Sequence, residues 1–123
     1  MSGPAFTDEP GAPGRLAECA ALAEWPLVVL VDDATAATRT PARFLWTAFT
    51  RMEPAADLHG RRRIHRNHVV FEGPVVLDAR MKPTYPEELF CDLDTAALVG
   101  RRWHEYFPGK TTEMGDSDVA DLG

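Results

Sequence analysis

A basic segment with three histidines is the densest group of side chains that could do chemistry. It is "HGRRRIHRNH", residues 59–68, and it holds four arginines. Arginines at this density favour anions, and His65 and His68 are spaced so that two imidazoles can share one metal ion. Zinc sites usually take three or four protein ligands, and no cysteine lies nearby. The favoured interpretation is therefore a basic loop that pairs with the acidic surface of a partner or with the chain's own acidic tail.

A pair of carboxylates, Asp32 and Asp33, follows the apolar run "PLVVLV" at 26–31. Ligand sites in α/β proteins often lie at the ends of strands, where two carboxylates can hold a metal or act as acid and base. Aspartate also ends strands and begins turns through hydrogen bonds to its own backbone. We favour the turn interpretation for both residues.

Two common motifs of catalytic and phosphate-binding sites are missing from the sequence. No serine lies in a G-x-S-x-G pattern, and no glycine-rich loop has the form that binds phosphate. The aromatic residues Phe44, Trp46, Phe49 and Trp103 recur at helical spacing, which favours core and interface positions. Residue types and spacing alone therefore predict no catalytic residue.

The overall composition excludes several classes of function. The 123 residues carry a net charge of -6, whereas nucleic-acid-binding domains are usually basic. No apolar run approaches the roughly 18 residues of a membrane span, and the N-terminus lacks the apolar region of a signal peptide. Cys19 and Cys91 are far apart and fit two reduced thiols, so we expect a cytoplasmic protein without nucleic-acid or membrane partners.

One domain is expected, over residues 14–109, between two disordered ends. Residues 1–13 are rich in proline and glycine and form a predicted disordered leader. Residues 110–123 hold four acids and one lysine and form a predicted acidic disordered tail. The chain begins with methionine and has polar ends, which is what we expect of an independent gene product.

The elements that position these side chains follow from periodicity and from capping residues. Apolar residues at helical spacing predict a helix over 16–23, and the β-branched run at 26–31 predicts a strand covered on both faces. Thr40 and Pro41 predict the start of a helix with an apolar stripe, which Pro54 ends. That stripe consists of Phe44, Leu45, Ala48, Phe49 and Met52.

The second half of the chain is predicted to form extended structure followed by a helix. "ADLH", 56–59, predicts a brief strand, and residues 68–79 predict extended structure broken at Gly73-Pro74. Asp94 is the expected cap of a last helix. The order of elements predicts an α/β fold: a small layered domain with a short mixed sheet, helices packed against it, and a βαβ unit.

Three motifs in fixed order carry a family resemblance. A helix carries L-W-x-x-x-T-R-x-x-P at 45–54, followed by A-x-D at 55–57. A strand then ends in D-A-x-x-K at 78–82, and the last helix ends in W-x-E-Y at 103–106. Together they resemble the C-terminal domain of the UbiD family of decarboxylases, over about residues 26–107.

The resemblance implies reversible, non-oxidative decarboxylation of aromatic or α,β-unsaturated acids. Family members use prenylated FMN with a divalent metal and potassium. A preceding domain holds the cofactor and supplies the Glu-Arg-Glu catalytic set and the metal ligands. No residue here matches those positions, so the resemblance implies no catalytic residue and no metal ligand in this chain. Prenylated FMN, the metal and potassium are then expected on a partner chain.

Two residues take a role from the resemblance. The lysine of the D-A-x-x-K turn resembles a contact to the cofactor phosphate, which makes Lys82 the one cofactor-binding candidate; the alternative is a solvated lysine in a turn. Arg51 matches the arginine of the helix motif and is expected in a buried or inter-domain ion pair. The basic segment at 59–68 replaces what is often a shorter link and indicates an interface particular to a subfamily.

The expected function is that of an accessory small subunit. A separate large UbiD-like subunit would carry out the (de)carboxylation in a hetero-oligomer, and this chain would complete its fold and help it to assemble. The alternative is a non-catalytic binding or regulatory module that keeps the fold. A third hypothesis is a metalloenzyme built on the histidines of the basic segment.

Overall fold

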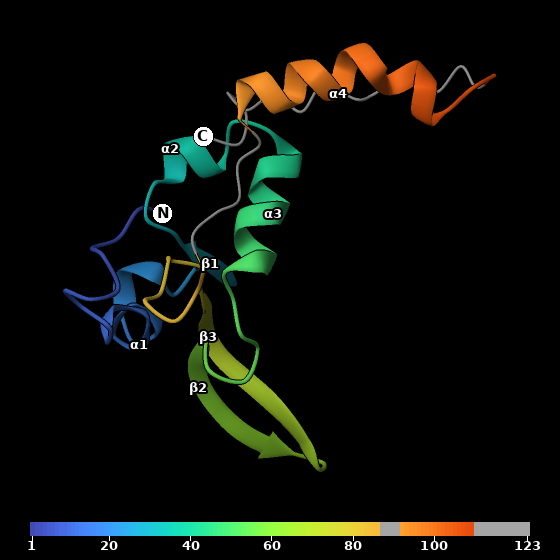
Figure 1. Cartoon of the computed structure of the whole chain (residues 1–123). Coiled ribbons are helices and arrows are strands. Elements are labelled where there is room, and N and C mark those ends of the chain that lie inside the picture. The colour runs from blue at the N-terminus through green and yellow to red at the C-terminus, as the bar shows by residue number, and fades with distance from the viewer. Residues whose placement is uncertain (87–91, 110–123) are drawn as a thin grey trace. The chain divides into compact units, whose positions relative to one another are not determined.

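The computed structural model describes residues 1–86 and 92–109, and Figure 1 shows the chain as a ribbon. The chain divides into two compact units, Met1–Pro86 and Glu87–Gly123. The division falls inside the domain predicted over 14–109. The predicted acidic tail at 110–123 lies outside the described residues.

The first unit is built on a three-stranded mixed sheet, which confirms the predicted α/β class. Its strands are β1 (Leu27–Leu30), β2 (Leu58–His65) and β3 (His68–Asp78), in the order β1-β3-β2. β1 pairs with β3 in parallel, as a βαβ unit requires, and β2 pairs with β3 antiparallel. The carboxyl ends of β1 and β3 therefore meet at one edge of the sheet.

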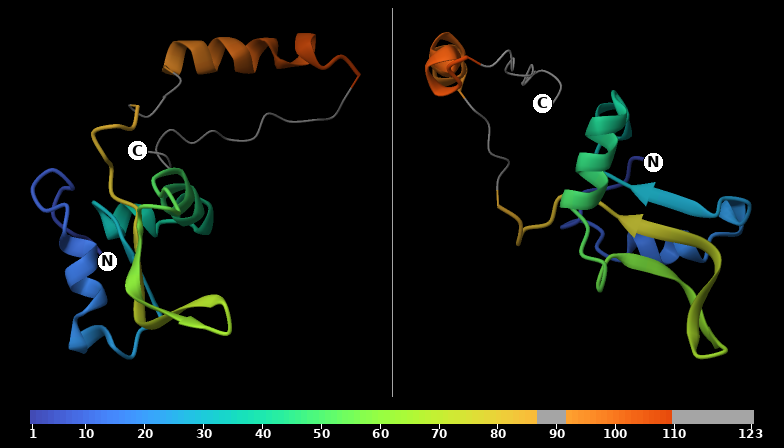
Figure 2. Two further views of the ribbon diagram at one scale, coloured as in Figure 1. Left: turned by 90° about the horizontal axis from the view of Figure 1, so that it is seen from below. Right: turned by 90° about the vertical axis from the view of Figure 1, so that its right-hand side faces the viewer.

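Helices cover both faces of the sheet because the side chains of β1 alternate. Val28 and Leu30 pack with α1 (Ala12–Ala17), whereas Val29 and Val31 belong to the cluster that includes α2 (Ala34–Ala37). The second view in Figure 2 shows β1 and β3 side by side, and the first view shows α1 to one side of them. The prediction of a strand covered on both faces is confirmed for the residues after Leu27.

The N-terminal segment packs, which differs from the predicted leader at 1–13. Ser2 forms a parallel bridge with Val31, and the Gly3 N–H donates to the Val31 carbonyl at 2.9 Å. Ala12 and Pro13 are buried in α1. Most of the contacts of this segment are made by backbone groups. Its proline- and glycine-rich composition therefore did not predict that it packs. The helix predicted over 16–23 is α1 followed by a short 3₁₀ turn, Ala20–Leu22.

The basic segment is a strand and a tight turn, not the predicted loop. β2 extends through His65, and Arg66 and Asn67 form the turn with φ of 50° and 63°. Two adjacent residues with positive φ suit a two-residue hairpin. β3 continues through the predicted break because Gly73, at φ 80°, accommodates an irregularity opposite His59 and Arg61 without the strain a side chain would add.

α3 (Pro41–Thr50) begins where the sequence predicts. The Thr40 hydroxyl accepts a hydrogen bond from the Arg43 N–H at 3.0 Å, and Pro41 takes the first helical position. Its apolar stripe is largely exposed, however: 53% of Leu45 and 64% of Phe49 face solvent. Most of the stripe is therefore exposed to solvent on the surface of this unit.

The second unit contains α4 (Leu93–Tyr106). Its cap is Asp92, which accepts from the Thr95 N–H at 2.8 Å, whereas Asp94 was predicted and lies in the first turn. The rings of Trp103 and Phe107 pack in a tilted arrangement with centroids 4.6 Å apart. None of the helices in the described part of the chain has the length and apolar character that crossing a bilayer needs.

Candidate functional site

Most of the buried charge lies at the edge where β1 and β3 end. This edge of a parallel sheet is where α/β proteins usually place ligands. β1 leads into two aspartates, β3 leads into the D-A-x-x-K turn, and the segment after α3 brings one arginine and one aspartate to the same place. We call this group the charged corner: Asp32, Arg51, Asp57, Asp78, Arg80 and Lys82.

The centre of the charged corner is the ion pair between Asp78 and Arg80. Arg80 is 0% exposed and Asp78 is 1% exposed. The Arg80 Nε donates to Asp78 Oδ1 and its Nη2 donates to Oδ2, both at 2.8 Å. Its Nη1 donates to the carbonyls of Pro4 and Glu9, each at 3.0 Å. The guanidinium therefore ties the end of β3 to the N-terminal segment.

The protonation state of Asp78 is fixed by this partner. Burial by itself raises the pKa of Asp78, but the hydrogen bonds and the charge of Arg80 outweigh it and hold the pKa below its usual value. The hydrogen bond to Asp78 raises the pKa of Arg80 in turn. Both groups are charged at neutral pH, so Asp78 is not poised as a general acid.

Acid is expected to destabilise the first unit through Asp78. A carboxyl whose pKa is lowered by folding stabilises the fold above its unfolded pKa of about 4, and this contribution is lost as the pH falls through the folded pKa. The free energy of unfolding in urea, measured from neutral pH down to about pH 2.5, should fall below about pH 4. Asp78→Asn should flatten that fall, and an identical slope in both proteins would contradict the assignment.

Lys82, the predicted phosphate contact, is buried in the same corner. Its Nζ donates to the carbonyls of Arg51 at 2.9 Å, Asp78 at 3.0 Å and Arg80 at 3.3 Å. It also lies 3.1 Å from Asp57 Oδ2. An ammonium group has three N–H donors, and these acceptors occupy them.

This arrangement does not fit a phosphate at Lys82. A phosphate oxygen would have to displace Asp57 or a carbonyl, and the ring of Tyr85 lies only 5.3 Å from Nζ. The alternative of a solvated lysine does not describe Lys82 either, because its side chain is only 9% exposed. The phosphate contact stays a prediction, and it would require the corner to rearrange.

Asp57 is a member of the corner to which residue types alone gave no role. It completes the A-x-D motif, which was its only signal. Its Oδ2 accepts from the Glu53 N–H at 2.7 Å, and its carbonyl accepts from the Asp78 N–H at 2.9 Å. Asp57 thus joins the end of α3 to the end of β3.

Asp33 has the local role that the turn interpretation predicts, whereas Asp32 binds residues far along the chain. Asp33 caps α2 by accepting from the N–H groups of Thr35 and Ala36. Asp32 Oδ2 accepts from the Met81 N–H at 2.8 Å and from the Arg51 Nη1 at 3.3 Å. Arg51 does form an ion pair, but its partner lies within this unit and the Asp32 side chain is 36% exposed, so the expectation of a buried or inter-domain pair is wrong.

His65 and His68 face each other across the base of the hairpin turn as paired residues of β2 and β3. Both are exposed. Within residues 1–86 and 92–109, no group of three or more histidine, cysteine, aspartate or glutamate side chains could hold a metal ion. The histidine pair thus has no third ligand of these types in the described part of the chain.

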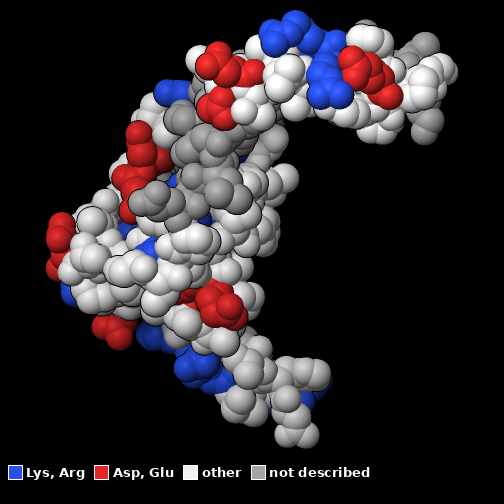
Figure 3. Space-filling view, in the orientation of Figure 1, with Lys and Arg blue, Asp and Glu red and all other residues white. Residues whose placement is uncertain are grey.

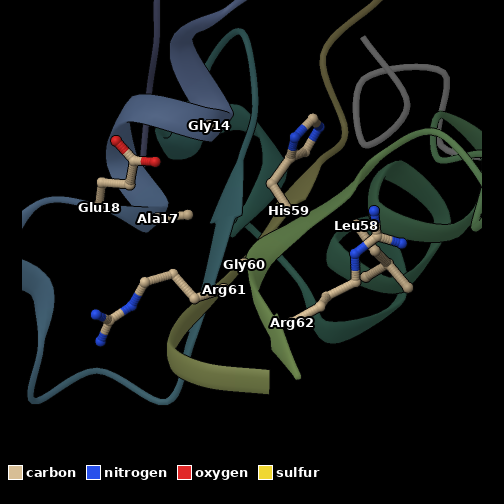
Figure 4. Close-up of a pocket in the computed structure, with 8 residues that line it drawn as sticks. All are labelled: Gly14, Ala17, Glu18, Leu58, His59, Gly60, Arg61 and Arg62. Atoms are coloured by element: carbon tan, nitrogen blue, oxygen red, sulfur yellow. The ribbon is translucent and has the colours of Figure 1, made fainter. Parts of the chain in front are cut away.

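Two open hollows lie away from the charged corner. One, of about 250 Å³, lies between α1 and β2, with Glu18 and Arg61 on the same side of it and Arg62 extending the other way (Figure 4). The other, of about 210 Å³, is lined mainly by apolar residues that include Val29 and Phe44. Neither hollow brings a nucleophile and a base together among its lining residues.

Comparisons with known proteins point to chlamydial relatives. No protein-family model matches the chain, and no solved structure matches it significantly. It is 48% identical over 88 residues to an uncharacterized protein of Chlamydia trachomatis, which covers 71% of this chain and 15% of that protein. It is 44% identical over 94 residues to a protein of Chlamydia pneumoniae named as a subunit of 4-hydroxybenzoate decarboxylase, which covers 74% of this chain and 16% of that protein.

A third relative, an uncharacterized protein of Chlamydia muridarum, is 42% identical over 87 residues. The matches cover only 15–16% of the length of these curated relatives. Identities of 42–48% over 87–94 residues show common ancestry with one portion of much longer proteins. The chain is thus homologous to a segment of a protein that bears the name of a decarboxylase subunit.

Proposed function

We propose that this chain is a non-catalytic part of a UbiD-type decarboxylase. It would complete the fold and the assembly of a catalytic chain that acts on aromatic or α,β-unsaturated carboxylic acids. The observation that carries the proposal is the 44% identity to the Chlamydia pneumoniae protein named as a 4-hydroxybenzoate decarboxylase subunit. The charged corner agrees with it, because its carboxylates are engaged in ion pairs and in hydrogen bonds to the backbone rather than in a reactive set.

The exposed face of α3 supports assembly with another protein surface. Leu45 and Phe49 are more than half exposed, and Phe44 and Trp46 on the same helix are each 36% exposed. Large apolar side chains gathered on one helix mark an interaction site more often than an ordinary surface. A domain that evolved against a neighbouring domain keeps such a face.

The cofactor in this proposal belongs to the catalytic chain. Prenylated FMN bound there would supply the chemistry of carbon–carbon bond cleavage, with the metal and potassium beside it. The residues of this chain would fix the shape of the surface that meets it. Arg80 and Lys82 are suited to that task, since each ties the end of β3 to another segment.

Complementation in trans tests the proposal. The Chlamydia pneumoniae relative, with the homologous segment deleted, is expected to lose activity on 4-hydroxybenzoate and to regain it when this chain is added. Decarboxylation is measured as the release of carbon dioxide. Complex formation is measured by size-exclusion chromatography.

The matched variants are Phe49→Asp, on the exposed face of α3, and Arg15→Ala, in an exposed ion pair with Glu9. The first should abolish rescue and the second should keep it. If a complex forms but activity is not rescued, the result would support a binding or regulatory module instead of the proposed role. Absence of both complex and rescue would refute it.

A further inference from the structure

The outer part of the β2–β3 hairpin exposes both of its faces. Every residue from Arg61 to Val69 is exposed, and we call this stretch the basic arm. Figure 1 shows it projecting from the first unit. A two-stranded hairpin with neither face covered is marginal in water, and antiparallel strands normally bury one face. The arm therefore has the form of a surface that a partner covers.

The charge of the arm is opposite to that of the rest of the chain. Residues 61–69 contain four arginines and no aspartate or glutamate, a net charge of +4 in a chain of -6. Glu72 pairs with Arg63. Lys and Arg side chains gather along the hairpin at the lower end of Figure 3. A partner surface that fits the arm is accordingly acidic.

The two faces of the arm differ in chemistry. Arg61, Arg63 and His65 alternate along one face of β2. Ile64, 69% exposed, lies on the other face with Arg62, and it pairs across the hairpin with Val69, 57% exposed. One face is therefore basic and the other largely apolar.

β2 is also an edge strand, since the sheet order is β1-β3-β2. In a hairpin with a two-residue turn, the pair next to the turn is hydrogen-bonded, and bonded and non-bonded pairs alternate from there. His65 pairs with His68 next to the turn, so the backbone N–H groups of Arg62 and Ile64 point to the outer edge. An edge of this kind is a template for another strand.

We propose that the outer edge of β2 binds an extended segment of a partner protein in which acidic and apolar residues alternate. The added strand would hydrogen-bond to Arg62 and Ile64 through its backbone. Its acidic side chains would lie beside Arg61 and Arg63, and its apolar side chains beside Ile64. The proposal concerns the chemistry of a partner and does not depend on the decarboxylase assignment.

Two other occupants fit less well. A second copy pairing through the same edge would bring the arginines of β2 close to their equivalents, and like charges on neighbouring strands are destabilising. Nucleic acid suits the arginines, but it offers no backbone donors and acceptors spaced like a strand and leaves Ile64 and Val69 uncovered. The alternation of the two faces thus favours a peptide strand.

A synthetic peptide with alternating glutamate and valine tests the proposal on the full chain. Fluorescence anisotropy should show that this peptide binds at least about tenfold more tightly than a control peptide with alternating lysine and valine. Affinity should fall as salt is raised, and hydrogen exchange by NMR should slow at the amides of Arg62 and Ile64 on binding. Equal binding of the two peptides, or unchanged exchange at both amides, would overturn it.

Matched variants separate charge from strand pairing. Arg61→Glu with Arg63→Glu should abolish binding, while lysine at both positions should keep most of it. Ile64→Pro removes one outward N–H at an edge position that tolerates proline, so the urea unfolding curve should persist while binding is lost. Undiminished binding by the proline variant would overturn strand addition. Dimerisation through the arm, or displacement of the peptide by single-stranded DNA or RNA, would assign the edge to those occupants instead.

Discussion

Arg80→Ala is expected to lower the free energy of unfolding of the first unit by about 3–5 kcal/mol, the usual effect of removing one member of a buried ion pair. The variant leaves the carboxylate of Asp78 buried without its guanidinium. It also removes the donors to the carbonyls of Pro4 and Glu9, so the N-terminal segment should loosen. Urea unfolding followed by circular dichroism measures the first effect, and hydrogen exchange over residues 1–13 measures the second.

The matched control is Arg63→Ala, since Arg63 forms an ion pair with Glu72 in which both side chains are about half exposed. Exposed pairs contribute about 0–1 kcal/mol, so this variant should unfold almost like the original. If Arg80→Ala fails to fold, Asp78→Leu with Arg80→Met keeps the experiment informative, because apolar replacement of both charges costs less than breaking the pair. Similar unfolding curves for Arg80→Ala and Arg63→Ala would contradict the role given to Arg80.

Lys82→Ala is expected to cost a similar amount, about 3–5 kcal/mol, because it leaves Asp57 buried without its cation. The phosphate contact that the resemblance implies would predict weaker cofactor retention with the fold intact. The structure instead makes loss of stability the first effect, because Nζ lies among three carbonyls and a carboxylate. An unfolding curve unchanged by the substitution would show that the buried position of Lys82 is wrong.

Asp57→Asn separates the two roles of Lys82. It weakens the same ion pair but leaves the ammonium group in place. Both variants are compared for flavin content in the assembled complex, at a temperature where each is folded. A greater loss of flavin from Lys82→Ala than from Asp57→Asn would support a phosphate contact, and equal retention would limit Lys82 to stabilising the corner.

Local signals in the sequence were sufficient for the elements nearest to their caps. Thr40 and Pro41 began α3 because a hydroxyl acceptor and a fixed φ act on adjacent residues. Asp33 was correctly expected to hydrogen-bond nearby backbone, and it does so two and three residues away. The run at 26–31 indicated a buried strand because β-branched residues continued on both faces.

The prediction of a loop for the basic segment is wrong because high charge does not distinguish a loop from an exposed edge strand. An edge strand with both faces exposed tolerates arginines at every position, so period-2 apolar alternation is absent from Arg61 to Arg63. The signal that was available was Asn67 after Arg66, which suits a two-residue turn with positive φ. The apolar stripe of α3 was likewise correct as a pattern, but the pattern does not say whether its partner is this chain or another.

By itself, the sequence determined the α/β class, the start of α3, the strand that becomes β1 and the resemblance that the chlamydial relatives support. These depend on residues close together in the chain or on motifs read in order. Only the tertiary structure decided that Lys82 pairs with Asp57 and that Arg80 holds Pro4, because such pairs join residues 25 or more positions apart. Burial then gives these charges their effect, since a charge removed from water must find a partner wherever the fold brings one.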